Sequence, residues 1–170
     1  MAGEILPPFF YHTARGATQK QTIATTVAPR YPTHLHIMNR GIRNNNPCNI
    51  RRTTTKWQGM SVEQTDKYFV QFVSKYYGIR AAIIILKNYY RQHHINTLHG
   101  IISRWAPLSE NDTQRYIAYM SECTEWEPFR MLDMGDPATI ARIVCAMAFF
   151  ESGMVLNYDS VLNIAKSEVR

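Results

Sequence analysis

The stretch from Asp136 to Tyr158 constrains the fold of this chain more than any other part of its sequence. Asp136 is followed by Pro137, and proline suits the first helical position because its missing N–H needs no partner there. Apolar residues then recur at helical spacing on two adjoining faces, Ile140, Val144 and Met147 on one and Ile143, Met147 and Phe150 on the other. The pattern predicts a helix that is buried over most of its circumference and ends at Gly153, a residue type favoured at the C-cap.

Glu151 continues the line of Ile140, Val144 and Met147, so the pattern places a carboxyl group on the buried face of the last turn. Burial and the negative end of the helix dipole both raise the pKa of a carboxyl group. A carboxyl that is partly neutral near pH 7 suits a general acid. The alternative is that Glu151 points into water from a frayed last turn, as most glutamates near helix ends do.

Positive charge is concentrated in the first third of the chain. Residues 1–62 contain 8 Lys and Arg against the single acid Glu4, whereas residues 63–170 contain 11 Lys and Arg against 12 acids. Such a region indicates an acidic partner, which nucleic acid, a cell-wall polymer or a protein surface would each provide. The length of 170 residues and the 45% hydrophobic fraction favour one domain with a sizeable core.

The three cysteines, Cys48, Cys123 and Cys145, are odd in number and contain no C-x-x-C pair. They therefore predict free thiols rather than a disulfide framework or a zinc site. The histidine pairs lack an H-E-x-x-H motif and clustered acids or cysteines, so we expect no metal and no cofactor. No apolar run approaches the length of a membrane span, and the N-terminus lacks the features of a signal peptide.

Residues 1–38 contain four of the eight prolines, several threonines and no sustained periodicity. This composition predicts an extended, basic arm, with the folded domain in residues 39–170. Because prolines and positive charges do not build a core, we expect the arm to serve assembly or anchoring through contacts with other proteins.

The segment from Asn39 to Met60 has a strong turn signal, because three consecutive asparagines precede Pro47. Cys48 disfavours a positive φ, so a type I turn fits better than a type II turn after Pro47. Ile50–Thr55 and Val62–Phe72 have the length and alternation of short strands that pair as a small antiparallel sheet.

Helical periodicity returns after this segment, and the complete pattern predicts an α+β domain of about five helices. The first predicted helix is Gly78–His93, and the second is a short helix capped by Asn96 that ends at Trp105. The third starts with the capping box of Asn111 and Gln114 and ends at Cys123. The Glu151 helix follows, and a last helix is capped by Asn157 or Asp159 and ends near Lys166.

The motifs RGIRNNNPCNIRR, KWQGM and RWAPLSENDTQRY, followed by a helix that ends in glutamate, resemble a family of short phage and prophage proteins. Members are often labelled virion structural proteins and regarded as lysozyme-like, and the likeness covers residues 39–164. Members usually carry glycine at position 48 and Asn-Gly after the glutamate, where this chain has Cys48 and Ser152-Gly153. The resemblance implies a lysozyme-like fold, mainly helical with a small antiparallel sheet. The strands here precede the acid, so the element order would be permuted.

The resemblance implies a virion-associated enzyme that acts on peptidoglycan at the host cell wall, as a muramidase or a lytic transglycosylase. Glu151 is then the candidate proton donor, and hydrolysis would need a second carboxylate at about 5 Å for retention or about 6.5–9.5 Å for inversion. Glu63 and Asp66 are the candidates for this second group, expected to be hydrated and ionised. The candidate substrate-binding residues are Asn44, Asn45, Asn46, Trp105, Glu110 and Tyr158.

Two other functions remain open at this stage. The first is a structural virion protein without catalysis, which uses residues 1–38 to bind neighbouring virion proteins. The second is a nucleic-acid-binding module, which the basic first third favours but which lacks interleaved aromatic residues and a recognition motif. An inactive protein should hold Glu151 in a salt bridge, whereas an enzyme should leave it open to substrate.

Overall fold

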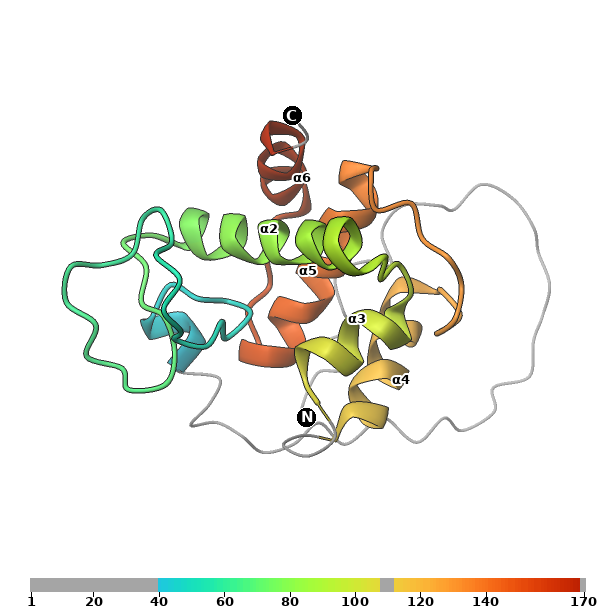
Figure 1. Cartoon of the computed structure of the whole chain (residues 1–170), viewed down its shortest axis with the longest axis horizontal. Helices are drawn as coiled ribbons and strands as arrows, with labels where there is room; N and C mark the ends of the chain where they lie inside the picture. Colours follow the sequence, from blue (N-terminus) through green and yellow to red (C-terminus); the bar gives the residue numbers. More distant parts are fainter. Residues whose placement is uncertain (1–39, 108–111, 169–170) are drawn as a thin grey trace, which may run out of the picture.

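The computed structural model describes residues 40–107 and 112–168, which are mainly helical. A helical turn at residues 40–43 and a long irregular segment precede the larger helices. The elements that follow are α2 (Lys75–His93), α3 (Leu98–Trp105), α4 (Thr113–Thr124), α5 (Pro137–Ser152) and α6 (Tyr158–Ser167). Helix α5 lies at the centre of the molecule and packs against α2, α4 and α6 (Figure 1).

Both predicted ends of the central helix are confirmed. The Asp136 carboxylate accepts hydrogen bonds from the backbone N–H groups of Ala138 and Thr139, at 2.9 and 3.3 Å. At the other end Gly153 is left-handed with φ 66°, and its N–H bonds to the last-turn carbonyls. The apolar line of Ile140, Val144 and Met147 is completely buried, as the pattern predicted.

The other helices agree with the predictions in position and differ at their caps. Helix α2 starts at Lys75, three residues before the predicted Gly78. Helix α3 is capped by Thr97, whose side chain accepts from the Gly100 N–H. The predicted cap Asn96 was wrong, because the helix begins one residue later; the Asn96 backbone carbonyl accepts from the Leu132 N–H at 2.8 Å.

Helix α4 is capped by Asp112, whose carboxylate accepts from the Arg115 N–H at 3.1 Å. The predicted capping box began at Asn111, which lies outside the described residues. For α6 the prediction left two caps open, and Asn157 is the one that bonds the Ser160 N–H.

The predicted small antiparallel sheet was wrong, and with it the α+β class. Across the residues that the structure describes, the irregular segment contains only two isolated antiparallel bridges, Arg51 with Phe69 and Met60 with Phe72. No strand or sheet forms in these residues, so the described part is helical with a long, irregular but tightly bonded segment.

Side-chain amides take the places that strand pairing would use. Val70 N–H donates to Ile50 O at 2.9 Å, but Ile50 N–H does not donate back to Val70 O, as it would in a continuing antiparallel ladder. Instead the Asn46 amide lies between the two chains, accepting from Ile50 N–H at 2.8 Å and donating to Val70 O at 2.9 Å. The Gln64 side chain likewise exchanges two hydrogen bonds with the backbone of Gln71. Because the amides satisfy these backbone groups, the ladder cannot extend.

One hydrophobic cluster joins the irregular segment to the helices. Cys48, Ile50, Val70 and Phe72 from this segment are buried together with residues from all five helices. The predicted arm of residues 1–38 lies outside the described residues. None of the described helices has both the length and the apolar character needed to cross a membrane.

Candidate active site

Glu151, in the last turn of α5, is the centre of the candidate site. Its Oε1 accepts a hydrogen bond from Trp105 Nε1 at 3.1 Å, and its Oε2 accepts one from Asn49 Nδ2 at 3.3 Å. The same Asn49 amide donates to the backbone carbonyl of Glu151 at 2.8 Å. Three distant segments, the asparagine-rich turn, the end of α3 and the end of α5, therefore meet at one carboxyl group.

The turn after Pro47 positions Asn49. Asn49 N–H donates to Asn46 O at 3.0 Å, and Asn49 itself is left-handed with φ 49°. Cys48 is not among the residues with positive φ, which confirms the prediction that a type I turn fits better than a type II turn there. Asparagine tolerates the left-handed conformation better than other non-glycine residues. Its side chain is thereby directed at the end of α5.

The asparagine-rich turn is also fastened directly to α5. Ser152 Oγ donates a hydrogen bond to Pro47 O at 2.9 Å. The Ala148 carbonyl oxygen lies at the same distance from Ser152 Oγ and is a second acceptor. Gly41 makes this approach possible, because a Cβ atom there would lie only 2.6 Å from Ser152 Cβ. The fixed contact keeps Asn49 in register with Glu151.

Burial raises the pKa of Glu151 from 4.5 to about 7. Hydrogen bonds from Asn49 and Trp105, the nearby Tyr116 hydroxyl and the positive charge of Arg51 lower the pKa without cancelling the effect of burial. The residue is half-buried and both side-chain oxygens have partners, so Glu151 does not extend freely into water. A substantial fraction of the acid form is therefore present at neutral pH.

The donors around Glu151 determine which oxygen carries the proton. The Trp105 indole can only donate, so Oε1 must act as the acceptor. The Asn49 amide orientation is fixed by its 2.8 Å bond to the Glu151 carbonyl, and its contact with Oε2 is longer at 3.3 Å. Oε2 has the longer and therefore weaker contact of the two, which favours it over Oε1 as the site of the transferable proton.

Tyr116 of α4 lies on the buried side of this group. Its ring stacks on Phe150 with centroids 3.8 Å apart and planes at 16°, and the residue is 2% exposed. Its hydroxyl forms no hydrogen bond with the residues that the structure describes, although it is close enough to Glu151 to lower the pKa of that acid. A buried phenol near a carboxyl group becomes a donor when the carboxyl loses its proton.

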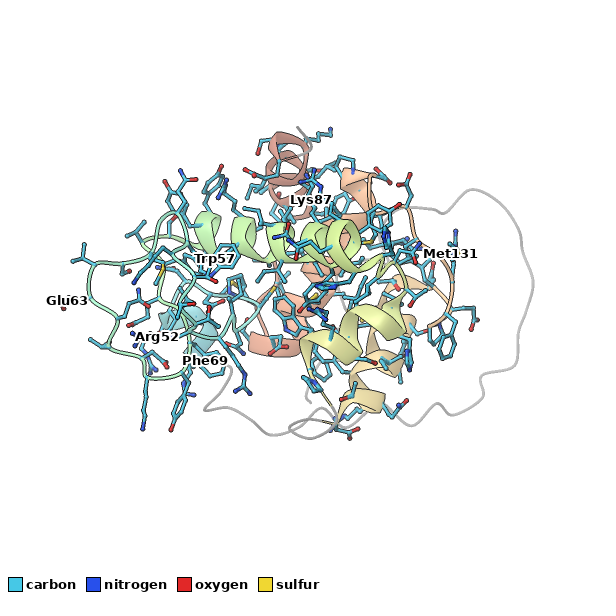
Figure 2. The ribbon with its side chains drawn as sticks, viewed as in Figure 1. Arg52, Trp57, Glu63, Phe69, Lys87 and Met131 are labelled. Atoms are coloured by element: carbon cyan, nitrogen blue, oxygen red, sulfur yellow. The ribbon has the colours of Figure 1, made fainter. Side chains whose placement is uncertain are left out.

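Of the two predicted second carboxylates, Glu63 is exposed at the tip of the irregular segment, directed outward (Figure 2). Asp66 is buried, and its Oδ1 accepts from the N–H groups of Tyr68 and Phe69 at 3.0 and 3.1 Å. The partners of its Oδ2 are Asn44 at 2.9 Å, Arg40 at 3.3 Å and Arg43 at 3.7 Å.

Burial alone would raise the pKa of Asp66, but hydrogen bonds from Asn44, Tyr68 and Phe69 and the charge of Arg40 outweigh it and lower the pKa. Asp66 is ionised as expected, but it is buried and fully bonded rather than hydrated. Its contacts fasten the helical turn at residues 40–43 to the irregular segment, which is a structural role.

The three consecutive asparagines also direct their amides into the fold. Asn44 bonds Asp66, Asn45 donates to Phe72 O at 3.0 Å, and Asn46 bridges Ile50 and Val70. Asn44 and Asn46 are at most 1% exposed. These amides hold the segment together, so the proposed contact of sugars with them has no support in their geometry.

The remaining candidates divide between the site and the rest of the fold. Trp105 lies at the site, bonded to Glu151. The Tyr158 hydroxyl contacts Ala138 O at 3.5 Å, in the first turn of α5. Thirteen residues of helix, about 20 Å, separate that turn from Glu151, so Tyr158 does not belong to the same site. Glu110 lies outside the described residues.

Two residues of the site were not among the predicted candidates, namely Asn49 and Tyr116. Asn49 stands in the same motif as the three asparagines, and the left-handed tolerance of asparagine next to a proline turn was the available signal. Tyr116 is buried on the inward face of α4, but nothing in the local sequence links it to Glu151.

No family model matches the sequence. The fold and the site define a mainly helical protein with a half-buried carboxyl group held by neutral hydrogen-bond donors. The chain is 33% identical over 144 residues to Protein P5 of Pseudoalteromonas phage PM2, a match that covers 82% of this chain and 88% of that protein. The chain therefore belongs to the family of this phage protein.

Proposed function

We propose that this protein is a virion-associated enzyme that cleaves the glycan strands of peptidoglycan, with Glu151 as the general acid. The observation that carries the proposal is the half-buried Glu151 carboxyl, whose pKa of about 7 and neutral donors keep an acid form available. The phage relationship supports a role in the virion. The motif resemblance supports the choice of substrate.

In the first step the proton on Oε2 passes to the glycosidic oxygen between two amino sugars. The bond from the anomeric carbon to that oxygen breaks, and its electron pair stays with the departing hydroxyl group. Glu151 becomes a carboxylate that Trp105 and Asn49 already face with N–H donors, and the Tyr116 hydroxyl is available as a third. These donors stabilise the charge that forms during the reaction.

In the second step the sugar itself supplies the nucleophile. Glu63 is exposed and Asp66 is saturated with partners, so neither suits the role of a second catalytic carboxylate. The C6 hydroxyl of the same sugar attacks the anomeric carbon, and its proton returns to the Glu151 carboxylate. The product is a 1,6-anhydro sugar, and Glu151 ends the cycle as an acid.

The test combines clearing of a peptidoglycan suspension with mass spectrometry of the soluble products. The wild-type protein should clear the suspension and release 1,6-anhydro ends. Glu151→Gln should lower the rate by at least about 100-fold, because the amide retains the size and polarity but cannot supply the proton. A Glu151→Gln protein that clears at the wild-type rate would exclude Glu151 as the acid. Ordinary reducing ends would exclude the single-acid route.

The second candidate function is a structural phage protein without catalysis, favoured by the use of all three asparagine amides in the fold. The neutral partners of Glu151 argue against it, because an inactive protein was expected to hold this acid in a salt bridge. We propose that residues 1–38 serve assembly in either case. Removing them should leave the thermal transition unchanged and abolish incorporation into particles. A lower melting temperature would show instead that these residues pack on the domain.

A further inference from the structure

The net charge of the described residues comes from one part of the molecule. Residues 40–73, here called the basic lobe, contain six basic residues, Arg40, Arg43, Arg51, Arg52, Lys56 and Lys67, against the two acids Glu63 and Asp66. The other described residues, 74–107 and 112–168, contain nine basic and nine acidic residues. The helical part is thus neutral, and the basic lobe carries the excess.

Most of this positive charge is accessible. Arg51, Arg52 and Lys56 belong to a continuous exposed run, and Lys67 is exposed as well. Arg43 keeps 65% of its side chain in solvent although it lies 3.7 Å from Asp66. Arg52 and Glu63 lie at one end of the molecule, whereas Met131 lies at the other (Figure 2).

Several contacts hold the basic lobe in a defined shape. Arg52 Nη1 donates to the backbone carbonyls of Gln64 and Asp66, at 3.2 and 2.9 Å, and both of these partners are neutral. The Lys67 ammonium lies 5.5 Å from the ring centre of Tyr68, which is 55% exposed. The lobe therefore presents fixed cations beside an open aromatic ring.

The basic lobe reaches the candidate active site. Asn49, which bonds Glu151, belongs to the lobe, and Arg51 is close enough for its charge to act on the Glu151 carboxyl. The exposed run of residues 51–56 thus begins two residues after the contact with Glu151, which places positive charge next to the candidate site.

We propose that the basic lobe binds the carboxylates of the peptide stems on peptidoglycan, next to the bond that Glu151 cleaves. The inference rests on the proposed function and names its substrate as glycan that carries acidic peptides, rather than an uncharged polymer of N-acetylglucosamine. Stem peptides supply several carboxylates along each strand, which an excess of fixed cations attracts at short range. Nucleic acid fits less well, because a ligand running through the site must also approach the Glu151 carboxyl.

The test measures binding separately from cleavage. The full chain with Glu151→Gln is pelleted with insoluble peptidoglycan and, separately, with chitin, which lacks peptides. In parallel the same protein is titrated with duplex DNA. A second protein adds Lys56→Gln and Lys67→Gln, which remove two exposed charges of the lobe. The matched control adds Arg130→Gln and Lys166→Gln, two exposed charges of the helical part, so that the net charge is the same.

The proposal predicts that the Glu151→Gln protein binds peptidoglycan much better than chitin and loses that preference between about 0.05 and about 0.5 M salt. The lobe variant should bind about tenfold more weakly at low salt, because it lacks two of the exposed charges of the lobe. The control should bind like its parent. Equal binding by lobe variant and control, or tighter binding to DNA than to peptidoglycan, would overturn the proposal.

The outcome distinguishes this inference from the proposed function. Unchanged peptidoglycan binding by the lobe variant, together with 1,6-anhydro products from the wild-type protein, would remove the lobe from substrate recognition and leave the enzyme intact. Lobe-dependent binding without any released product from the wild-type protein would support the lobe and contradict catalysis.

Discussion

Two carboxyl groups in this molecule, the buried Asp66 and the half-buried Glu151, differ in what surrounds them. Asp66, in the basic lobe, has two arginines, an asparagine amide and two backbone N–H groups as partners, and its pKa is lowered. Glu151, at the end of α5, has only neutral donors at its two oxygens, and burial raises its pKa to about 7. Burial disfavours the charge of both groups, so the supply of compensating partners decides whether a carboxylate holds the fold together or stays available as an acid.

The largest difference in stability is expected for Asp66→Asn. The amide leaves Arg40 and Arg43 without their anion and places an N–H₂ group where backbone donors point, which we expect to cost about 3 kcal/mol of unfolding free energy. Urea denaturation at pH 7 measures the loss, with Glu63→Gln as a control that should change nothing because Glu63 is exposed. Equal stabilities of the two variants would contradict the structural role of Asp66.

The pH dependence of stability should have opposite signs for the two groups. Asp66 has a lowered pKa in the folded state, so it stabilises the fold above pH 3.8 and loses that contribution as the pH falls through its folded value. Glu151 has a raised pKa, so the folded state holds more protons than the unfolded state between pH 4.5 and about 7. Its ionisation therefore destabilises the fold as the pH rises through this range, by about 3 kcal/mol.

Glu151→Gln isolates the second of these effects, because the neutral amide has no charge to desolvate. The stability of the variant relative to the wild type should therefore rise by about 3 kcal/mol between pH 4.5 and pH 8. Denaturant titrations at both pH values measure the difference. Identical pH profiles of variant and wild type would show that Glu151 ionises without cost.

The smallest effect is expected from changing one donor at Glu151. Trp105→Phe removes the N–H that stabilises the carboxylate, so the pKa of Glu151 should rise further. The measurement is the rate of peptidoglycan clearing as a function of pH. A lost hydrogen bond of about 1 kcal/mol corresponds to a shift of about 0.7 pH unit toward alkaline pH in the part of this profile where the rate falls because Glu151 loses its proton. Tyr158→Phe is the control, because Tyr158 lies at the other end of α5 and should leave the profile unchanged. A shift toward acidic pH in Trp105→Phe would reverse the assignment of donor and acceptor.

The features of α5 could be predicted because their causes are local. Asp136 and Pro137 start the helix and Gly153 ends it through contacts within a few residues, and the apolar line needs only helical spacing. The same spacing places Glu151 on the buried face. Its pKa of about 7 also depends on Trp105 and Asn49, which lie 46 and 102 residues earlier in the chain and have no periodic signal.

The irregular segment could not be predicted in the same way. The alternation from Phe69 to Phe72 is typical of a strand, and Val70 does begin to pair with Ile50. Whether the ladder continues depends on the Asn46 amide, which is 24 residues from Val70 and occupies the place of the return bond. The burial of Asp66 could not be predicted for a related reason. The arginines that surround it belong to the turn at residues 40–43, which is distant from Asp66 in the sequence.

The central claim is that Glu151 is an acid that remains partly protonated at neutral pH. The most direct measurement is a carbon-detected NMR titration of the glutamate side-chain carboxyls, with the Glu151 signal assigned by its absence in Glu151→Gln. We expect a midpoint near pH 7 for Glu151, well above the ordinary glutamate value of 4.5. A midpoint at or below 4.5 would contradict it, because the carboxyl would then be fully ionised at neutral pH and could not donate a proton.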